Sequence, residues 1–237
     1  MLFSNLRWTL KLFFALLLGV IYSLWQPHIY AAESPIVIAA PTLDSPKATH
    51  SLQTTVLSGG CFWGIQGVFE HVRGVRKVVA GYAGDDKTSA NYKAVSSGTT
   101  GHAESVQITF DPAEVSYGEL LHIFFSVAHD PTQLNRQGPD SGTQYRSAIF
   151  YIDNSQKNIA QAYVAQLNKS KAFTHDIVTR IDAFTTFYAA EDYHQDFLIH
   201  NPSYPYIVVN DLPKIENLKH VFPNSYLKQP MMLNSTP

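Results

Sequence analysis

The chain has 237 residues, of which 45% are hydrophobic and 15% are charged, and this is enough to bury one sizeable core. Its formal net charge is -2, and it has no long run of lysine or arginine. The sequence therefore lacks the basic stripe that nucleic-acid binding needs, and we expect no nucleic-acid partner.

The first residues have the pattern of an export segment. The basic residues Arg7 and Lys11 precede an uncharged, largely apolar stretch over residues 12–25. This stretch is shorter than the roughly 20 apolar residues that span a bilayer, and it suits the central region of a signal peptide. We expect a signal peptide over residues 1–32, cleaved near Ala32, and a periplasmic or secreted protein. Because the small-residue pattern before Ala32 is poor, an uncleaved amino-terminal anchor is the alternative.

The rest of the chain is predicted to comprise a linker, one domain and a tail. Residues 33–50 mix proline, alanine, serine and threonine without a period, which indicates a linker. We expect a single catalytic domain over residues 51–210 and a carboxy-terminal tail over residues 211–237.

Hydrophobic spacing predicts short strands and helices that alternate along the domain. In chain order, we expect a strand over residues 55–57, a helix that begins just after Gly60, strands over residues 75–79 and 105–110, a helix from Ser116 to about His129, a strand over residues 148–152, a helix over residues 155–168 and a strand over residues 177–181. Ser116 and Glu119 have the spacing of a capping box.

This order of elements indicates an α+β fold. Helices interleaved with mixed strands, joined partly by hairpin-like connections, predict a two-layer α/β sandwich rather than a doubly wound parallel sheet. Residues 81–97 and the segment between His129 and Ala148 are predicted to be long irregular loops. Loops of that length are commonly functional, so the chemistry is expected there.

The single cysteine of the chain, Cys61, is the candidate nucleophile. It follows Gly60 at a strand-to-helix turn, where unpaired N–H groups and the helix dipole favour thiolate over thiol. A lone cysteine is more often a small buried hydrophobe, and the adjacent Phe62 and Trp63 fit either a core or a substrate pocket. With one cysteine, no intramolecular disulfide is possible.

Four motifs resemble, in the same order, those of the A-type peptide methionine sulfoxide reductases. They are Gly60-Cys61-Phe62-Trp63-Gly64, Gly101-His102-Ala103-Glu104, the stretch over residues 130–138 that continues through Asp140 to residues 142–147, and Ala190-Glu191-Asp192-Tyr193-His194-Gln195. Four ordered motifs that span the presumed domain are far more specific than any one of them. The resemblance implies an α/β roll with a ferredoxin-like core.

The resemblance also implies a role for each matched side chain. It makes Cys61 the nucleophile that attacks the sulfoxide sulfur and becomes a sulfenic acid, Glu104 the acid that protonates the departing oxygen, Tyr92 and Tyr145 the phenols that hydrogen-bond that oxygen, Phe62 and Trp63 the wall that binds the methyl group, and Asp140 a member of the hydrogen-bond network. The substrate would be methionine-S-sulfoxide, free or in oxidised exported proteins that the enzyme repairs.

The reaction itself requires a proton donor. Sulfoxide oxygen is a poor leaving group until it is protonated, so Glu104 must hold a proton when it acts. Because burial beside apolar rings disfavours an ionised carboxyl, we predict a raised pKa for Glu104. The phenols of Tyr92 and Tyr145 can donate hydrogen bonds without being ionised at neutral pH.

The sequence departs from many members of that family in its reducing system. Residues 202–237 contain no cysteine, so an external thiol must reduce the sulfenic acid directly or through a mixed disulfide. The donor is either a thioredoxin-like protein or a small thiol. We expect no bound cofactor, no metal site and a monomer.

Some positions allow a structural interpretation. Pro139 has no N–H to donate and Ser141 replaces an often basic residue, so the placement of Asp140 is the least constrained of the site. We interpret Tyr82 as a packing residue and His194 as support for the core.

Two other functions fit single features of the sequence. A cysteine–histidine hydrolase or acyl transferase would use His102 or His194 as the base for Cys61. A non-catalytic binding domain would only grip methionine-like side chains. Because only the reductase consumes a thiol in each turnover, dithiothreitol distinguishes the three functions.

Overall fold

The computed structural model describes residues 34–46 and 51–233. The predicted export segment over residues 1–32 lies outside the described residues. Among the residues that are described, no helix is both long enough and apolar enough to cross a membrane.

A six-stranded mixed sheet forms the centre of the domain. Its strands stand in the order β7-β6-β1-β3-β2-β8. All neighbours are antiparallel except β6 and β7, which are parallel. The strands are β1 (Gln53–Gly59), β2 (Val75–Ala83), β3 (Ala103–Phe110), β6 (Ser147–Tyr151), β7 (Arg180–Ala183) and β8 (Phe187–Ala189), and a separate two-stranded ribbon pairs β4 (Arg136–Gln137) with β5 (Asp140–Ser141).

The helices vary widely in length. The α-helices are α2 (Phe62–Glu70), α3 (Tyr92–Val95), α4 (Tyr117–Ile123), α5 (Asn154–Lys169), α6 (Phe197–His200) and α7 (Leu212–Val221). Short 3-10 turns are η1 (Lys87–Ser89), η3 (Thr143–Tyr145) and η4 (Asp192–His194), and wider π-helical turns are η2 (Phe124–Ala128) and η5 (Ile207–Asp211).

The main core lies between one face of the sheet and the helices. Alternation along β3 turns Val106, Ile108 and Phe110 to the same face, where all three are fully buried with residues of α2, α4, α5 and α7. On the opposite face, Val56 and Phe150 belong to a smaller cluster that also contains the rings of Phe184 and Phe187. The helices therefore form one layer and the sheet the other.

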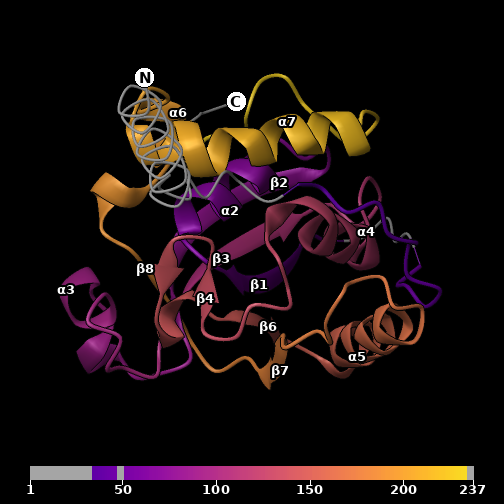
Figure 1. The fold of residues 1–237 in the computed structure, drawn as a ribbon, viewed down its shortest axis with the longest axis horizontal. Helices are drawn as coiled ribbons and strands as arrows, with labels where there is room; N and C mark the ends of the chain where they lie inside the picture. Colours follow the sequence, from indigo (N-terminus) through magenta and orange to yellow (C-terminus); the bar gives the residue numbers. More distant parts are fainter. Residues whose placement is uncertain (1–33, 47–50, 234–237) are drawn as a thin grey trace, which may run out of the picture. The chain divides into compact units, whose positions relative to one another are not determined.

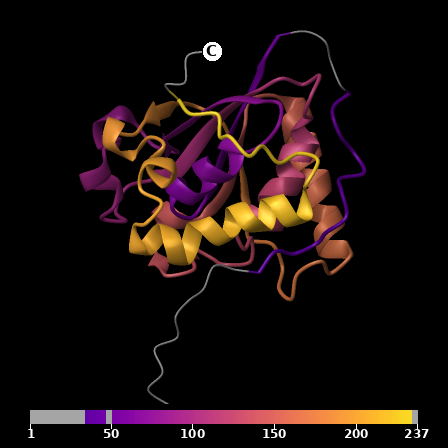
Figure 2. The same cartoon turned by 90° about the horizontal axis from the view of Figure 1, so that it is seen from above.

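The carboxy-terminal part of the described chain lies against the helix that follows the cysteine. Figures 1 and 2 show α7 beside α2, and α5 beside α4, in both views. After α7, the chain pairs with the end of α2: Leu227 N–H donates to the carbonyl of His71 at 2.7 Å, and Met231 N–H donates to the carbonyl of Glu70 at 2.8 Å. Residues after 211 thus pack against the same helix that Cys61 begins.

The predicted mixed two-layer α/β fold is confirmed, and so is the capping box of Ser116 and Glu119 at the start of α4. The prediction of a loop over residues 81–97 is wrong, because it contains the end of β2 and all of α3. The last predicted strand, over residues 177–181, is shifted: β7 begins at Arg180, and the Val178 N–H instead donates to the carbonyl of Pro131. The predicted domain boundaries remain predictions.

Candidate active site

The turn that presents Cys61 depends on a glycine. Gly60 has φ +97°, in the left-handed region, and a Cβ at this position would lie 2.6 Å from the Gln137 side chain. Only glycine fits both the backbone and the packing here. The turn ends β1 and makes Cys61 the N-cap residue of α2, with its side chain only 8% exposed.

Glu104 meets this turn from the neighbouring part of the sheet. It lies on the same face of β3 as Val106, and its side chain is 2% exposed. The Phe62 N–H, at the first turn of α2, donates to Glu104 Oε2 at 3.1 Å. Burial raises the pKa of Glu104 to about 8, although the Phe62 N–H opposes this shift. The predicted raised pKa is confirmed, and Glu104 is largely protonated at neutral pH.

The thiol of Cys61 differs from the expectation. Its place at the start of a helix favours thiolate, but burial, followed by the charges of Glu104, Asp211 and Asp140, raises the pKa of Cys61 well above its usual value. Loss of hydration and the nearby carboxyls therefore oppose the preference for thiolate that the helix start gives Cys61. The resting site therefore holds a thiol beside a protonated carboxyl.

Tyr92 and Tyr145 reach the site from two separate loops. Tyr92 opens α3, and Tyr145 ends η3. Burial, and then the charge of Glu104, raise the pKa of both phenols. Arg146 holds the second loop, because its guanidinium donates to the carbonyl of His102 at 3.0 Å, two residues before Glu104. Both phenols are therefore protonated hydrogen-bond donors close to the acid.

Asp140 lies in β5 and has a partner that sequence reasoning missed. The hydroxyl of Tyr206 donates to Asp140 Oδ2. Burial raises the pKa of Asp140, while Tyr206 and Lys214 oppose that shift. Tyr206 precedes η5 in the stretch that the sequence shows as a run of apolar residues. Tyr206 belongs to none of the four motifs, so no sequence signal pointed to it.

Asp211 and Lys214 form a second group that the sequence did not predict. Asp211 is fully buried, and its Oδ1 lies 3.2 Å from Lys214 Nζ. A Cβ on Gly64, in the first turn of α2, would lie 2.1 Å from that same oxygen. The carboxyl is therefore packed against the turn that carries Cys61, and glycine is required for this approach.

The two aromatic residues after Cys61 differ in exposure. Phe62 is 1% exposed and packs inside the domain, with its ring centroid 5.9 Å from that of Tyr82. Trp63 is partly exposed and stacks on Phe197, with centroids 3.8 Å apart and an interplanar angle of 12°. The rings of Tyr204 and Tyr206 lie nearly perpendicular to that of Trp63, with centroid distances of 6.1 and 6.0 Å. The apolar surface next to Cys61 is thus centred on Trp63.

The histidines considered as bases for Cys61 have other partners. His102 has its Nε2 2.9 Å from the carbonyl of Asp86, and His194 accepts the Trp63 indole N–H. Tyr82 is buried and its hydroxyl donates to Glu191 Oε2 at 2.9 Å, which agrees with a packing role. The described part of the chain contains no cluster of histidine, cysteine and acidic side chains able to hold a metal ion.

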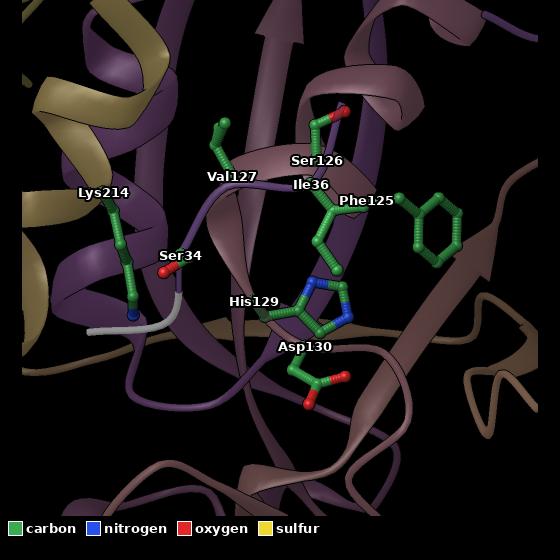
Figure 3. Close-up of a pocket in the computed structure, with 8 residues that line it drawn as sticks. All are labelled: Ser34, Ile36, Phe125, Ser126, Val127, His129, Asp130 and Lys214. Atoms are coloured by element: carbon green, nitrogen blue, oxygen red, sulfur yellow. The ribbon is translucent and has the colours of Figure 1, made fainter. Parts of the chain in front are cut away.

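A small cavity is lined by residues of the first described segment, of η2 and of α7. Its volume is about 70 Å³, and Figure 3 shows His129, Asp130 and Lys214 among its lining residues. His129 packs against Gly59, accepts or donates a hydrogen bond at 2.7 Å with Ser147 Oγ, and burial lowers its pKa to about 3. Cys61 does not line this cavity, and the lowered pKa of His129 leaves its imidazole neutral at neutral pH.

Comparison with known proteins identifies the family. The family model described as peptide methionine sulfoxide reductase matches residues 53–226. Peptide methionine sulfoxide reductase MsrA 2 of Mesorhizobium japonicum is 59% identical over 189 residues, which are 80% of this chain and 97% of the relative. The protein of the same name from Synechocystis is 51% identical over 197 residues, which are 83% of this chain and 91% of the relative.

Solved structures agree with this result. Reduced Mxr1 from Saccharomyces cerevisiae is 30% identical with a TM-score of 0.58, covering 71% of this chain and 94% of its own. Methionine sulfoxide reductase A of Corynebacterium diphtheriae is 30% identical with a TM-score of 0.56. This match covers 73% of this chain and 87% of the Corynebacterium chain. The chain therefore belongs to the peptide methionine sulfoxide reductase family, and it is an enzyme that reduces methionine sulfoxide.

Proposed function

We propose that this chain reduces methionine-S-sulfoxide through a sulfenic acid on Cys61, with Glu104 as the proton donor. The observation that carries the proposal is one hydrogen bond. The backbone N–H of Phe62, the residue after Cys61, donates to the Glu104 carboxyl at 3.1 Å. A thiol at the start of α2 and a protonated carboxyl on β3, which is held by the Phe62 N–H, are the two reagents that sulfoxide reduction needs.

The atoms balance as follows. The Cys61 sulfur attacks the sulfoxide sulfur while the Glu104 proton is transferred to the sulfoxide oxygen. Methionine leaves as the thioether, and the oxygen ends on Cys61 as S–OH, so that the cysteine is oxidised by two electrons and the substrate is reduced by two. The thiol proton of Cys61 replaces the one that Glu104 gave. Tyr92 and Tyr145, as protonated phenols, stabilise negative charge that develops on the oxygen.

The second half of the cycle uses an external thiol. One thiol attacks the Cys61 sulfenic acid, releasing water and leaving a mixed disulfide, and a second thiol releases Cys61 as the thiol and leaves as an external disulfide. The chain has only one cysteine, so this route is the one open to it. A thioredoxin-like protein and a small thiol both satisfy this chemistry, and the substrate is free or protein-bound methionine sulfoxide.

The first test uses the full-length protein, each epimer of methionine sulfoxide and dithiothreitol, beside the Cys61→Ser variant. Methionine should form from the S epimer alone, and the variant should form none. Omitting dithiothreitol should limit the yield to about one methionine per enzyme molecule. Turnover by Cys61→Ser, or repeated turnover without a thiol, would contradict the proposal.

We also propose that the enzyme acts outside the cytoplasm, on oxidised exported proteins, because the first 32 residues have the pattern of a signal peptide. Fractionation of cells that produce the protein, with mass measurement of its amino terminus, tests this. A mature chain beginning near Glu33 outside the cytoplasm supports cleavage and export. A full-length chain in the membrane fraction supports the amino-terminal anchor instead, and a full-length chain in the cytoplasm excludes both.

A further inference from the structure

One short segment, residues 191–194, hydrogen-bonds to both Trp63 and Tyr92. Trp63 lies in α2 and Tyr92 opens α3, and the chain between them includes all of β2. Both residues nevertheless hydrogen-bond to the turn formed by Glu191 and η4, which ends at His194. We call residues 191–194 the site clamp.

Glu191 holds the start of α3. Its Oε1 accepts the Tyr92 backbone N–H at 2.9 Å, and its Oε2 accepts the Tyr82 hydroxyl at 2.9 Å. Burial alone would raise the pKa of Glu191, but these two donors lower it overall, so the carboxyl is ionised and both hydrogen bonds are charge-assisted. Because α3 has only four residues, this external bond determines where Tyr92 is placed.

His194 holds Trp63 by a bond that fixes its own protonation state. The Trp63 indole N–H donates to His194 Nδ1 at 3.1 Å. An indole nitrogen can only donate, so Nδ1 must carry no proton and the imidazole is neutral with its proton on Nε2. Among the described residues, this Nε2 has no hydrogen-bond partner, and the ring is 2% exposed.

The same imidazole contacts the other walls of the site. Its centroid lies 5.0 Å from that of Phe62 and 4.6 Å from that of Tyr92. The titratable groups that face it are Tyr92, Tyr193 and Glu191. Both phenols keep their protons at neutral pH because their pKa values are raised, so Glu191 is the charged group among them.

We propose that Glu191 and His194 are positioning residues of the reductase, in which neutral His194 fixes the Trp63 indole against Phe197 and ionised Glu191 fixes Tyr92 beside Glu104. The proposal rests on the roles proposed above for Trp63 and Tyr92. A proton on Nδ1 would face the indole N–H with another donor and break the bond. Burial lowers the pKa of His194, which keeps the acceptor available at neutral pH, and Glu191 opposes that shift.

Two replacements of His194 separate positioning from packing. His194→Asn keeps an acceptor near the position of Nδ1 but cannot titrate, whereas His194→Phe keeps a ring without an acceptor. We expect His194→Phe to raise KM for methionine sulfoxide roughly five- to tenfold with a smaller change in kcat, as loss of one hydrogen bond implies. His194→Asn should keep KM within about twofold at neutral pH, and its KM should not rise with acidification, whereas we expect the wild-type KM to rise once acid protonates His194.

Glu191→Gln tests the other half of the clamp. Glutamine retains an oxygen for the Tyr92 N–H but not the charge, so kcat should fall by roughly threefold while KM changes little. Glu191→Ala should lower kcat further. An unchanged kcat in Glu191→Ala would overturn the assignment of Tyr92 to this clamp.

The indole provides a direct readout. The chain has three tryptophans, so full-length protein carrying Trp8→Phe and Trp25→Phe emits from Trp63 alone. We expect the Trp63 emission to change as acid is added when His194 is present. In both His194 variants, the emission should no longer depend on pH in this way. Emission that stays independent of pH in the wild-type clamp, or equal KM increases in His194→Asn and His194→Phe, would overturn the proposal.

These outcomes remain separable from failure of the proposed mechanism. If Cys61→Ser retains activity, the sulfenic acid route is wrong, but the Trp63 emission still reports whether His194 holds the indole. If His194→Phe does not fold, as far-ultraviolet circular dichroism would show, the pH profile and emission of His194→Asn decide the question.

Discussion

The hydroxyl of Tyr206 donates a hydrogen bond to Asp140 Oδ2, joining the chain that leads into α7 to the ribbon of β4 and β5. Removing this donor should withdraw an interaction that keeps the pKa of Asp140 from rising further. We expect Tyr206→Phe to lower kcat/KM roughly fivefold, the effect of about one hydrogen bond. Steady-state assays measure this, with Tyr204→Phe as the matched control. Equal losses in the two variants would assign the effect to general packing.

The pKa of Glu104 predicts a pH limit on activity. Burial raises that pKa to about 8, and the protonated carboxyl is the active form. The kcat should therefore be complete well below pH 8 and fall as the pH rises through about 8, because the proton donor is lost. Glu104→Gln, which has no proton to give, should be slower by roughly a hundredfold or more and should lose this limb. A wild-type kcat that stays flat to pH 9.5 would exclude Glu104 as the acid.

Glu70 should make stability depend on pH in the opposite way from most carboxyls. It is fully buried near Asp196, and burial first, then Asp196, raise its pKa to about 9. The unfolded chain releases this proton above about pH 4.3. The resulting stability is complete below that value and is lost as the pH rises through about 9. Glu70→Gln should therefore melt near the wild-type temperature at pH 5 and above it at pH 9.

The exposed Glu216, which pairs with Lys219, provides the control for that measurement. Glu216→Gln should melt like the wild type at both pH values. The Leu233 amide donates to Asp196 at 3.1 Å. At pH 9, hydrogen exchange of this amide should be slower in Glu70→Gln than in the wild type. Identical melting of Glu70→Gln and the wild type at pH 9 would show that Glu70 is not protonated in the folded chain.

Gly64 should tolerate no side chain. An added Cβ would lie 2.1 Å from Asp211 Oδ1 and 2.9 Å from Lys214 Nζ. We expect Gly64→Ala to destabilise the fold by about 1–3 kcal/mol and to lower kcat, because the buried ion pair must move away from the cysteine turn. Thermal melts and kinetics measure both. Gly138→Asn is the control, since a Cβ there meets nothing within 4 Å and asparagine tolerates φ +55°.

Local features were the most accessible from the sequence. The capping box of Ser116 and Glu119 depends on side chains three residues apart, so spacing alone predicted it. The resemblance to the family indicated five site residues: Cys61, Glu104, Tyr92, Tyr145 and Asp140. In the structure these five residues interact electrostatically with one another. Their proposed chemical roles still await the tests above.

Tertiary effects were not accessible in the same way. The helix-start argument for Cys61 considered only neighbours along the chain, whereas its pKa is set by burial and by carboxyls from β3, β5 and η5. Asp211 and Lys214 carried no motif, and their importance depends on η5 and α7 folding back onto Gly64. The helix α3 was missed because it has only four residues, too few for a hydrophobic period.

Tyr206 and Asp211 lie late in the sequence, so they are among the last parts of the site to be synthesised. A ribosome adds Cys61 and Glu104 more than 100 residues before Tyr206 and Asp211, since synthesis runs from the amino terminus. A nascent chain stopped before Tyr206 has the nucleophile and the acid, but Asp140 has no phenol and Gly64 faces no carboxyl. We therefore expect a chain that premature termination ends before Tyr206 to carry an unfinished site.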